Sequence, residues 1–197
     1  MNERSDEELI ESVKKGSEMD FRVLYGRYKR PIYNYLYHFL ENRSSAEDCA
    51  QDVFLRLYRK ASKYDPVEGS FSSWLFRMAK NVALDLLRRN KLRRTQSLDT
   101  PLSGDEGKEF SLKELVASDA PDVHQNIETE ERKLMLEKAL WKLSAEDREP
   151  LILCDIEGMS HKKAAEILGC VSGTLTVRLF RARQKLAVIL GWAKEDV

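Results

Sequence analysis

Apolar residues recur along the first 94 positions with the three- and four-residue spacing of amphipathic helices. Ser5 and Glu8 form a capping-box pattern ahead of the first apolar face, and Gly16 is placed to end that helix. Ser17 is placed to cap a second helix, in which Pro31 predicts a kink or a restart. The chain therefore opens with two amphipathic helices.

The same signals continue to position 94. Ser44 and Glu47 predict another capping box, which opens a third helix. Proline and glycine mark residues 63–69 as a loop, after which Ser70 is placed to cap a long fourth helix. We therefore predict that residues 5–94 form a helical bundle.

The helical periodicity fades over residues 95–126, where prolines, glycines and acidic residues dominate. We interpret this stretch as an acidic flexible linker, with at most a short helical turn near residues 112–116. Helical periodicity resumes near Ile127, and Ser144 is placed to start a further helix. Pro150 lies beyond the first turn of that helix, so we expect a kink or a delayed start there.

The spacing of small and apolar residues after Gly158 predicts a helix-turn-helix within residues 127–192. Ala165 is small where two helices would cross, and Gly169 can adopt the positive φ of a tight turn. Leu175 would then fill the space between the two helices. The helix from Ser172 would offer these side chains to a major groove: Ser172, Thr174, Thr176, Val177, Arg178 and Arg181.

Composition supports an all-α fold of two small helical domains. Nine glycines and five prolines in 197 residues are too few for an all-β chain with a turn every ten residues or so. Basic and acidic residues number 33 each, so the chain is not uniformly basic. The longest apolar runs fall well short of the ~18 residues that span a membrane, so we expect no integral membrane segment.

The balanced charge conceals two basic blocks separated by an acidic one. Residues 69–94 hold seven basic side chains and one acidic, and residues 159–190 hold six and one. Residues 95–131, between them, hold two basic and ten acidic side chains. Either basic block can neutralise phosphates and release counterions, whereas DNA would repel the acidic segment.

The long helix after Ser70 combines phosphate-binding and base-reading side chains. Lysine and arginine suit phosphates, while asparagine and aspartate can bond base edges. With the tyrosine of the preceding loop, the candidate set for melted DNA is Tyr64, Arg77, Lys80, Asn81, Asp85, Arg88 and Arg89. Phe71 and Trp74 could also stack on bases, but their inward spacing favours the core.

Two sets of motifs resemble those of bacterial RNA polymerase sigma factors. The first resembles region two and comprises Ala46-Glu47-Asp48, Gln51-Asp52-Val53-Phe54-Leu55-Arg56, Phe71-Ser72-Ser73-Trp74-Leu75 and Ala79-Lys80-Asn81, with Asp85, Arg88 and Arg89. The second, residues 140–186, resembles region four. A short chain with only these two regions is similar to the extracytoplasmic-function (ECF) group.

The resemblance implies a role for each set of residues. Asp48, Gln51, Asp52 and Arg56 would bind the core polymerase. The loop of residues 64–70 and the helix that follows it would hold the melted −10 element, and the helix from Ser172 would read the −35 element. The acidic linker would thread the polymerase's basic RNA channel, and an anti-sigma factor is an expected partner. A sigma factor would act in the cytoplasm.

Four positions depart from the family pattern, the first being Ser144, which follows Leu143 where the family usually has a proline. Thr176 stands where a basic residue is usual and Val177 where a serine is frequent, so phosphate and polar contacts are lost. Pro150 replaces a common aliphatic residue. These departures leave the −35 sequence open.

Three other functions compete with the sigma factor. An enzyme is disfavoured because the three histidines are scattered, the cysteines form no CxxC pair and no glycine-rich phosphate loop occurs; we expect no catalytic site, metal or cofactor. Three widely spaced cysteines fit reduced thiols in a cytosol.

A conventional helix-turn-helix regulator would bind duplex DNA without polymerase, and an adaptor would bind polymerase without reading DNA. Arg178 and Arg181 argue against the adaptor, whereas Thr176 and Val177 are compatible with it.

Overall fold

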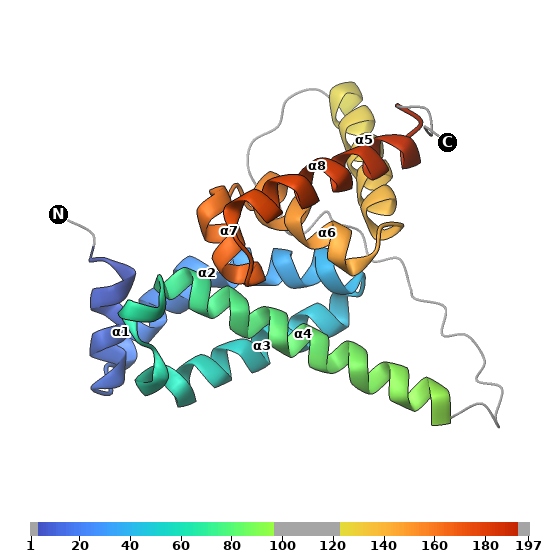
Figure 1. Cartoon of the computed structure of the whole chain (residues 1–197). Helices are drawn as coiled ribbons and strands as arrows, with labels where there is room; N and C mark the ends of the chain where they lie inside the picture. Colours follow the sequence, from blue (N-terminus) through green and yellow to red (C-terminus); the bar gives the residue numbers. More distant parts are fainter. Residues whose placement is uncertain (1–3, 97–122, 193–197) are drawn as a thin grey trace.

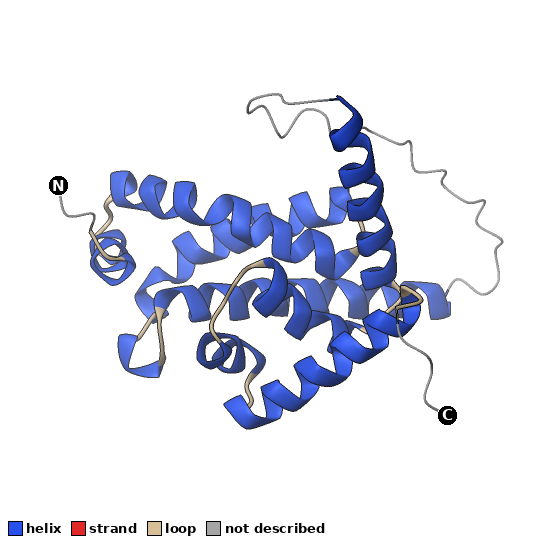
Figure 2. Cartoon of the chain, turned by 90° about the horizontal axis from the view of Figure 1, so that it is seen from above, coloured by secondary structure: helices blue, strands red, loops and turns tan. Residues whose placement is uncertain are grey.

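The computed structural model describes residues 4–96 and 123–192, and every regular element in these ranges is a helix (Figures 1 and 2). The all-α prediction is confirmed. The first group comprises α1 (Asp6–Lys14), α2 (Glu18–Leu40), α3 (Arg43–Lys60), the short 3-10 turns η1 (Ala61–Lys63) and η2 (Pro66–Glu68), and α4 (Phe71–Gln96). The second comprises α5 (Val123–Trp141), α6 (Ala145–Leu151), the π-helical turn η4 (Ile152–Ile156), α7 (His161–Leu168) and α8 (Ser172–Ile189).

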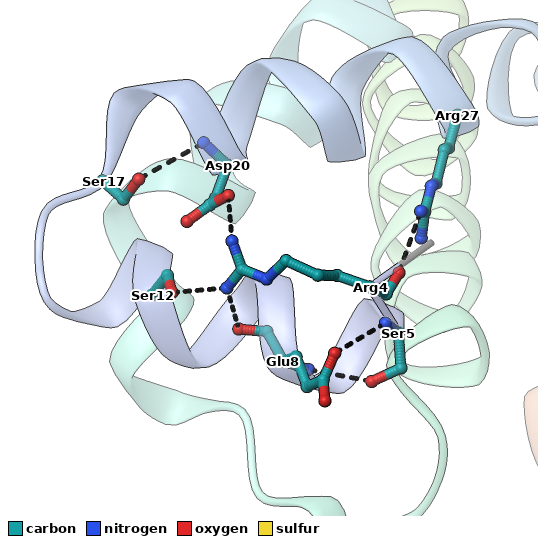
Figure 3. Close-up of polar contacts among 7 residues, drawn as sticks. All are labelled: Arg4, Ser5, Glu8, Ser12, Ser17, Asp20 and Arg27. Atoms are coloured by element: carbon teal, nitrogen blue, oxygen red, sulfur yellow. Dashed lines mark hydrogen bonds and ion pairs between the residues drawn. The ribbon is translucent and has the colours of Figure 1, made fainter. Parts of the chain in front are cut away.

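Arg4 ties α1 to α2 (Figure 3). Its guanidinium donates to Asp20 Oδ1 at 2.6 Å, to Ser12 Oγ at 2.8 Å and to the Glu8 carbonyl at 3.2 Å. The predicted capping box is confirmed, because Ser5 Oγ accepts from the Glu8 N–H while Glu8 Oε2 accepts from the Ser5 N–H. These bonds satisfy amide groups that a helix start otherwise leaves without partners.

Two predictions about the N-terminal helices are wrong. α3 is capped by Asn42 rather than Ser44: Asn42 Oδ1 accepts from the Ser45 N–H at 2.8 Å, and Glu47 instead pairs with Arg43. Asparagine caps as well as serine does, so the helix starts at the earlier of the two capping residues. Of the two outcomes predicted for Pro31, a restart does not occur, because α2 runs without interruption from Glu18 to Leu40.

The predicted helix-turn-helix is α7, a turn and α8. Gly169 has φ +68° at the end of α7, a conformation that favours glycine. Ala165 and Leu175 are both buried, as the sequence pattern requires. α5, the first helix of the C-terminal group, begins at Val123 rather than near Ile127. Most of the predicted linker, including residues 112–116, lies outside the described residues.

Pro150 changes the local helix geometry without ending the helix. It lies inside α6, which passes directly into the π-helical turn η4. Since proline has no N–H, the carbonyl of Glu146, four residues earlier, receives no helical hydrogen bond. That carbonyl instead accepts from the Arg178 side chain on α8 at 3.2 Å. Pro150 thus leaves an acceptor through which α6 contacts α8.

The two groups of helices pack against each other. α7 packs on α4, while α5, α6 and η4 pack on α2. Figure 1 shows the orange and red C-terminal helices lying along the blue and green N-terminal ones. Buried side chains of both groups form one hydrophobic cluster. No helix in the described ranges has the length and apolar character needed to cross a membrane.

Candidate nucleic-acid interface

Ser70 and the loop before it position α4. Ser70 Oγ accepts from the Ser73 N–H at 3.3 Å, so the predicted cap is confirmed. Tyr64 lies between the two 3-10 turns, is buried, and donates from its hydroxyl to the Gly69 carbonyl at 3.2 Å. Its ring packs on Phe71 and Trp74. In this structure Tyr64 therefore shapes the loop and leaves no ring face open for stacking.

Phe71 and Trp74 face inward, as their spacing predicted. Phe71 is fully buried and Trp74 is half-buried against the core. Their rings contact Tyr64 and each other, with centroids 5.5–6.2 Å apart. The aromatic residues thus form the floor of the loop.

The remaining candidates on α4 divide into two sets. Asn81, Arg88 and Arg89 are exposed, and Asp85 lies beside them, with its carboxylate 3.6 Å from Arg88 Nη1. Arg89 Nε donates to the Asp85 carbonyl at 3.2 Å. These four residues form an open polar face over the middle of α4.

Arg77 and Lys80 lie instead beneath the C-terminal helices. Lys80 Nζ donates to Glu149 Oε2 of α6 at 3.0 Å. Arg77 Nη2 and Glu166 Oε2 of α7 both lie close to Gly69. Each is 3.8 Å from the position that the first side-chain atom of a larger residue would take there. Ser73 also donates to Glu166, at 3.0 Å. Periodicity alone could not reveal these contacts, because their partners lie 69 and 93 residues away.

The N-terminal half of α8 is largely exposed. Ser172, Thr174, Thr176, Val177 and Arg181 are exposed, while Arg178 is half-buried by its bond to the Glu146 carbonyl. Thr176 Oγ1 donates to the Ser172 carbonyl within the helix. Phe180, which the sequence analysis did not single out, is 60% exposed. Helical spacing could have indicated this exposure, because Phe180 falls outside the buried stripe of Leu175, Leu179 and Ala182.

Two further basic residues of α8 are held by carboxylates of its own domain. Arg183 binds Asp155 with bonds of 2.5 and 3.1 Å, and this bond raises the pKa of Arg183. Lys185 donates to Asp147 Oδ2 at 2.6 Å, which lowers the pKa of that carboxyl. The C-terminal half of α8 therefore fastens the helix to α6 and η4.

The four predicted polymerase-binding residues share the outer side of α3. Asp48 and Gln51 are exposed, and Arg56 pairs with Asp52 at 2.9 Å. Leu55, which sequence reasoning missed as a surface residue, is 54% exposed. It falls outside the buried stripe of Cys49, Val53 and Leu57, so helical spacing alone could have indicated it.

The described residues show no cluster of three or more His, Cys, Asp or Glu side chains arranged to hold a metal ion. The three cysteines are free thiols. Cys49 is buried, and burial raises its pKa, as it does for Cys154. A raised pKa leaves the thiol protonated and poorly nucleophilic.

Both halves of the chain match known protein families. Residues 24–93 match the family model for Sigma-70 region 2, and residues 133–186 match that for Sigma-70, region 4. The ECF RNA polymerase sigma factor SigW of Bacillus subtilis is 30% identical over 177 residues, which cover 90% of this chain and 92% of the relative. SigE of Mycolicibacterium smegmatis is 33% identical over 155 residues, covering 79% of this chain but 55% of the relative, so the chain spans about half the length of that protein.

Among solved structures, the sigma factor RpoE of Bartonella quintana, crystallised with the anti-sigma factor NepR, has a TM-score of 0.66. The match covers 89% of this chain and 99% of that chain, at 23% identity, and it shows a shared fold.

Proposed function

Because this chain belongs to the ECF group of RNA polymerase sigma factors, we propose which of its residues bind core polymerase, the −10 element and the −35 element. A sigma factor binds core RNA polymerase and directs promoter recognition, melting and initiation. The observation that carries the assignment is the occurrence of both regions, in order, on the two groups of helices. We assign residues 5–94 to the core- and −10-binding domain, 95–126 to the linker and 127–192 to the −35-binding domain.

The −10 surface is the polar face of α4. The exposed Asn81, Arg88 and Arg89 support direct contacts with melted DNA, in which arginine binds phosphates and asparagine a base edge. Asp85 lies next to Arg88, with its carboxylate 3.6 Å from Nη1. Tyr64 contributes by ordering the loop through its bond to the Gly69 carbonyl. Lys80 and Arg77 join this surface when the C-terminal helices are displaced.

The −35 surface is the exposed part of α8. Ser172, Thr174 and Thr176 lie in its first turns, where backbone N–H groups and hydroxyls suit phosphates. Val177, 50% exposed, offers an apolar contact of the kind made with thymine methyl groups. Arg181 is exposed and available to the groove, whereas Arg178 donates to the Glu146 carbonyl of α6 and would contact DNA through its remaining N–H groups.

The core polymerase surface is the outer side of α3. Asp48, Gln51 and the Asp52–Arg56 pair supply polar contacts, and Leu55 adds an exposed apolar side chain among them. An apolar residue ringed by polar ones is the usual composition of a protein interface.

An anti-sigma factor is a further proposed partner, supported by the solved relative that was crystallised with one. The chain would act where polymerase acts, in the cytoplasm, and would catalyse no reaction of its own. A conventional helix-turn-helix regulator is not favoured, because it leaves the region 2 match over residues 24–93 without a role.

Run-off transcription with core polymerase over a pool of genomic fragments tests the function. We expect transcripts from defined promoters only when this chain and core polymerase are both present. Tight, sequence-specific binding to a duplex by the chain alone, with no polymerase-dependent transcript, would instead support the conventional regulator.

A further inference from the structure

A carboxylate of α6 is buried against the N-terminal helices. Glu149 is only 4% exposed, and its two oxygens accept hydrogen bonds from different residues. Oε1 accepts from the Tyr35 hydroxyl of α2 at 2.9 Å, and Oε2 accepts from Lys80 Nζ of α4 at 3.0 Å. Burying a charge is costly unless it is well paired, so these two donors account for its position.

Tyr35 is held so that it can act only as a donor. Its ring is fully buried between Phe39 and Phe76. Burial, and then the Glu149 carboxylate, raise the pKa of Tyr35 well above its usual value, so the hydroxyl keeps its proton. Lys80, whose side chain is 21% exposed, adds a positive charge on the other side of the same carboxylate.

A hydroxyl and an ammonium group that converge on two anionic oxygens form an anion-binding site. The site lies on the side of α4 that continues into the exposed Asn81 and Arg88. A phosphate presents the same pair of negatively charged oxygens as a carboxylate does, and charge-assisted bonds favour both. Glu149 therefore occupies a position that suits a backbone phosphate of DNA.

We propose that the Tyr35 hydroxyl and the Lys80 ammonium form a phosphate-binding site for promoter DNA, which Glu149 fills in this structure. DNA binding at this site and packing of α6 on α2 and α4 are then mutually exclusive. The proposal rests on the function assigned above and adds Tyr35 as a DNA ligand and Glu149 as its intramolecular competitor.

Neighbouring contacts keep Glu149 in place. Arg148, buried beside it, forms an ion pair with Glu41 at the end of α2. Ser73 of α4 donates to Glu166 of α7. Each bond joins the two groups of helices, so weakening one of them shifts the population toward the arrangement in which Tyr35 and Lys80 are open.

The competition is tested by binding of the free, full-length chain to a fluorescent single-stranded DNA of mixed sequence, at constant salt. Glu149→Gln removes the competing charge. Glu146→Gln is the matched control, because it makes the same charge change at an exposed position of the same helix. We expect Glu149→Gln to bind at least fivefold more tightly than Glu146→Gln. Equal affinities would overturn the competition.

The role of Tyr35 is tested in the opened background. Adding Tyr35→Phe to Glu149→Gln removes one hydroxyl and keeps the ring, and we expect at least a threefold loss of affinity. The loss should disappear on an oligonucleotide whose backbone is uncharged methylphosphonate. An unchanged affinity for the charged strand would exclude Tyr35 as a phosphate ligand.

Folding is checked by circular dichroism melting of every variant. If Glu149→Gln does not fold, Glu41→Gln weakens the same packing from a more exposed position. It must also tighten DNA binding, and an unaltered affinity would contradict the proposal.

Run-off transcription by the wild-type holoenzyme is scored separately. Failure there removes the sigma function, whereas normal transcription with equal Glu149→Gln and Glu146→Gln affinities removes only this inference.

Discussion

Arg181 and Arg183 are two residues apart on α8 but differ in their surroundings. Arg181 is exposed, while Arg183 forms two bonds with Asp155. We expect Arg181→Ala to weaken holoenzyme binding to a −35-containing promoter by about 1–3 kcal/mol, the cost of a lost base contact. Arg183→Ala is the control and should leave affinity near the wild-type value. A salt titration of promoter binding measures both. Wild-type affinity for Arg181→Ala would remove this residue from the groove.

Glu157 predicts a pH dependence of stability. Burial raises its pKa to about 7 from 4.5, and Oε1 has no hydrogen-bond partner among the described residues. The folded chain therefore holds more protons between these values. The stabilising contribution is complete below pH 4.5 and is lost as pH rises through 7.

Glu157→Gln should therefore stabilise the chain at pH 8 relative to wild type, by about 1–2 kcal/mol after solvent screening, and by much less at pH 5. Thermal melting at both values measures the difference. Glu146→Gln, an exposed acid, serves as the control. A pH-independent gain would mean that Glu157 does not titrate in this range.

At the scale of the element, α4 combines a buried stripe with an open polar face. Asn81 and Arg88 lie seven residues apart, about two turns, on the open side. We expect Asn81→Ala or Arg88→Ala to reduce open-complex formation by about 1–3 kcal/mol and to leave core binding intact. Permanganate footprinting of the melted region measures this. Lys142→Ala, which removes an exposed charge outside the proposed surfaces, should have no effect. Full melting by both variants would place the DNA elsewhere.

On α3, the exposed Leu55 carries a different expectation. Leu55→Asp should weaken binding to core polymerase about tenfold or more, because an interface that buries an unpaired carboxylate loses roughly 1.4 kcal/mol or more. Met19→Asp, at another exposed apolar position, is the control. Competition of each variant with wild-type chain for core polymerase gives the ratio. Equal competition by Leu55→Asp would exclude this side of α3.

Local signals predicted the elements well, and long-range contacts explain what they missed. Ser5 and Glu8 specified a capping box that needs only neighbours. The sequence pattern pointed to Ser44, but Asn42, two residues earlier and an equally good capping residue, caps α3 in the structure. Lys80 was predicted on a DNA-facing basic surface, but in the structure its ammonium group bonds Glu149 of another helix. The spacing of a single helix contains no information about such a partner.

At the scale of the whole molecule, His38 reports on the packing of the two groups of helices. Burial, and then Lys133 and Arg148 from α5 and α6, lower its pKa to about 4 from 6.5. The unfolded chain therefore binds more protons in this interval. The stability that depends on neutral His38 is complete above pH 6.5 and is lost as pH falls toward 4.

Glu157 changes the stability of the chain with pH in the opposite direction, so it must be replaced before the contribution of His38 can be measured. In a Glu157→Gln background, acidification from pH 7 to 4.5 should destabilise the chain, and His38→Gln should reduce that loss by about 1–2 kcal/mol. Chemical denaturation at the two pH values provides the measurement. Identical losses with and without His38 would mean that the ring stays hydrated at the contact.

The bond from Arg178 to the Glu146 carbonyl has a consequence for the thermodynamics of promoter binding. A free arginine side chain loses up to about 2 kcal/mol of rotamer entropy when it is fixed. Arg178 is already restrained, because Pro150 leaves an acceptor on α6 that its guanidinium occupies. The ordering cost of this side chain is met during folding rather than at docking. If Arg178 contacts promoter DNA as proposed, the backbone acceptor that Pro150 frees on α6 reduces the entropy that this side chain loses on binding.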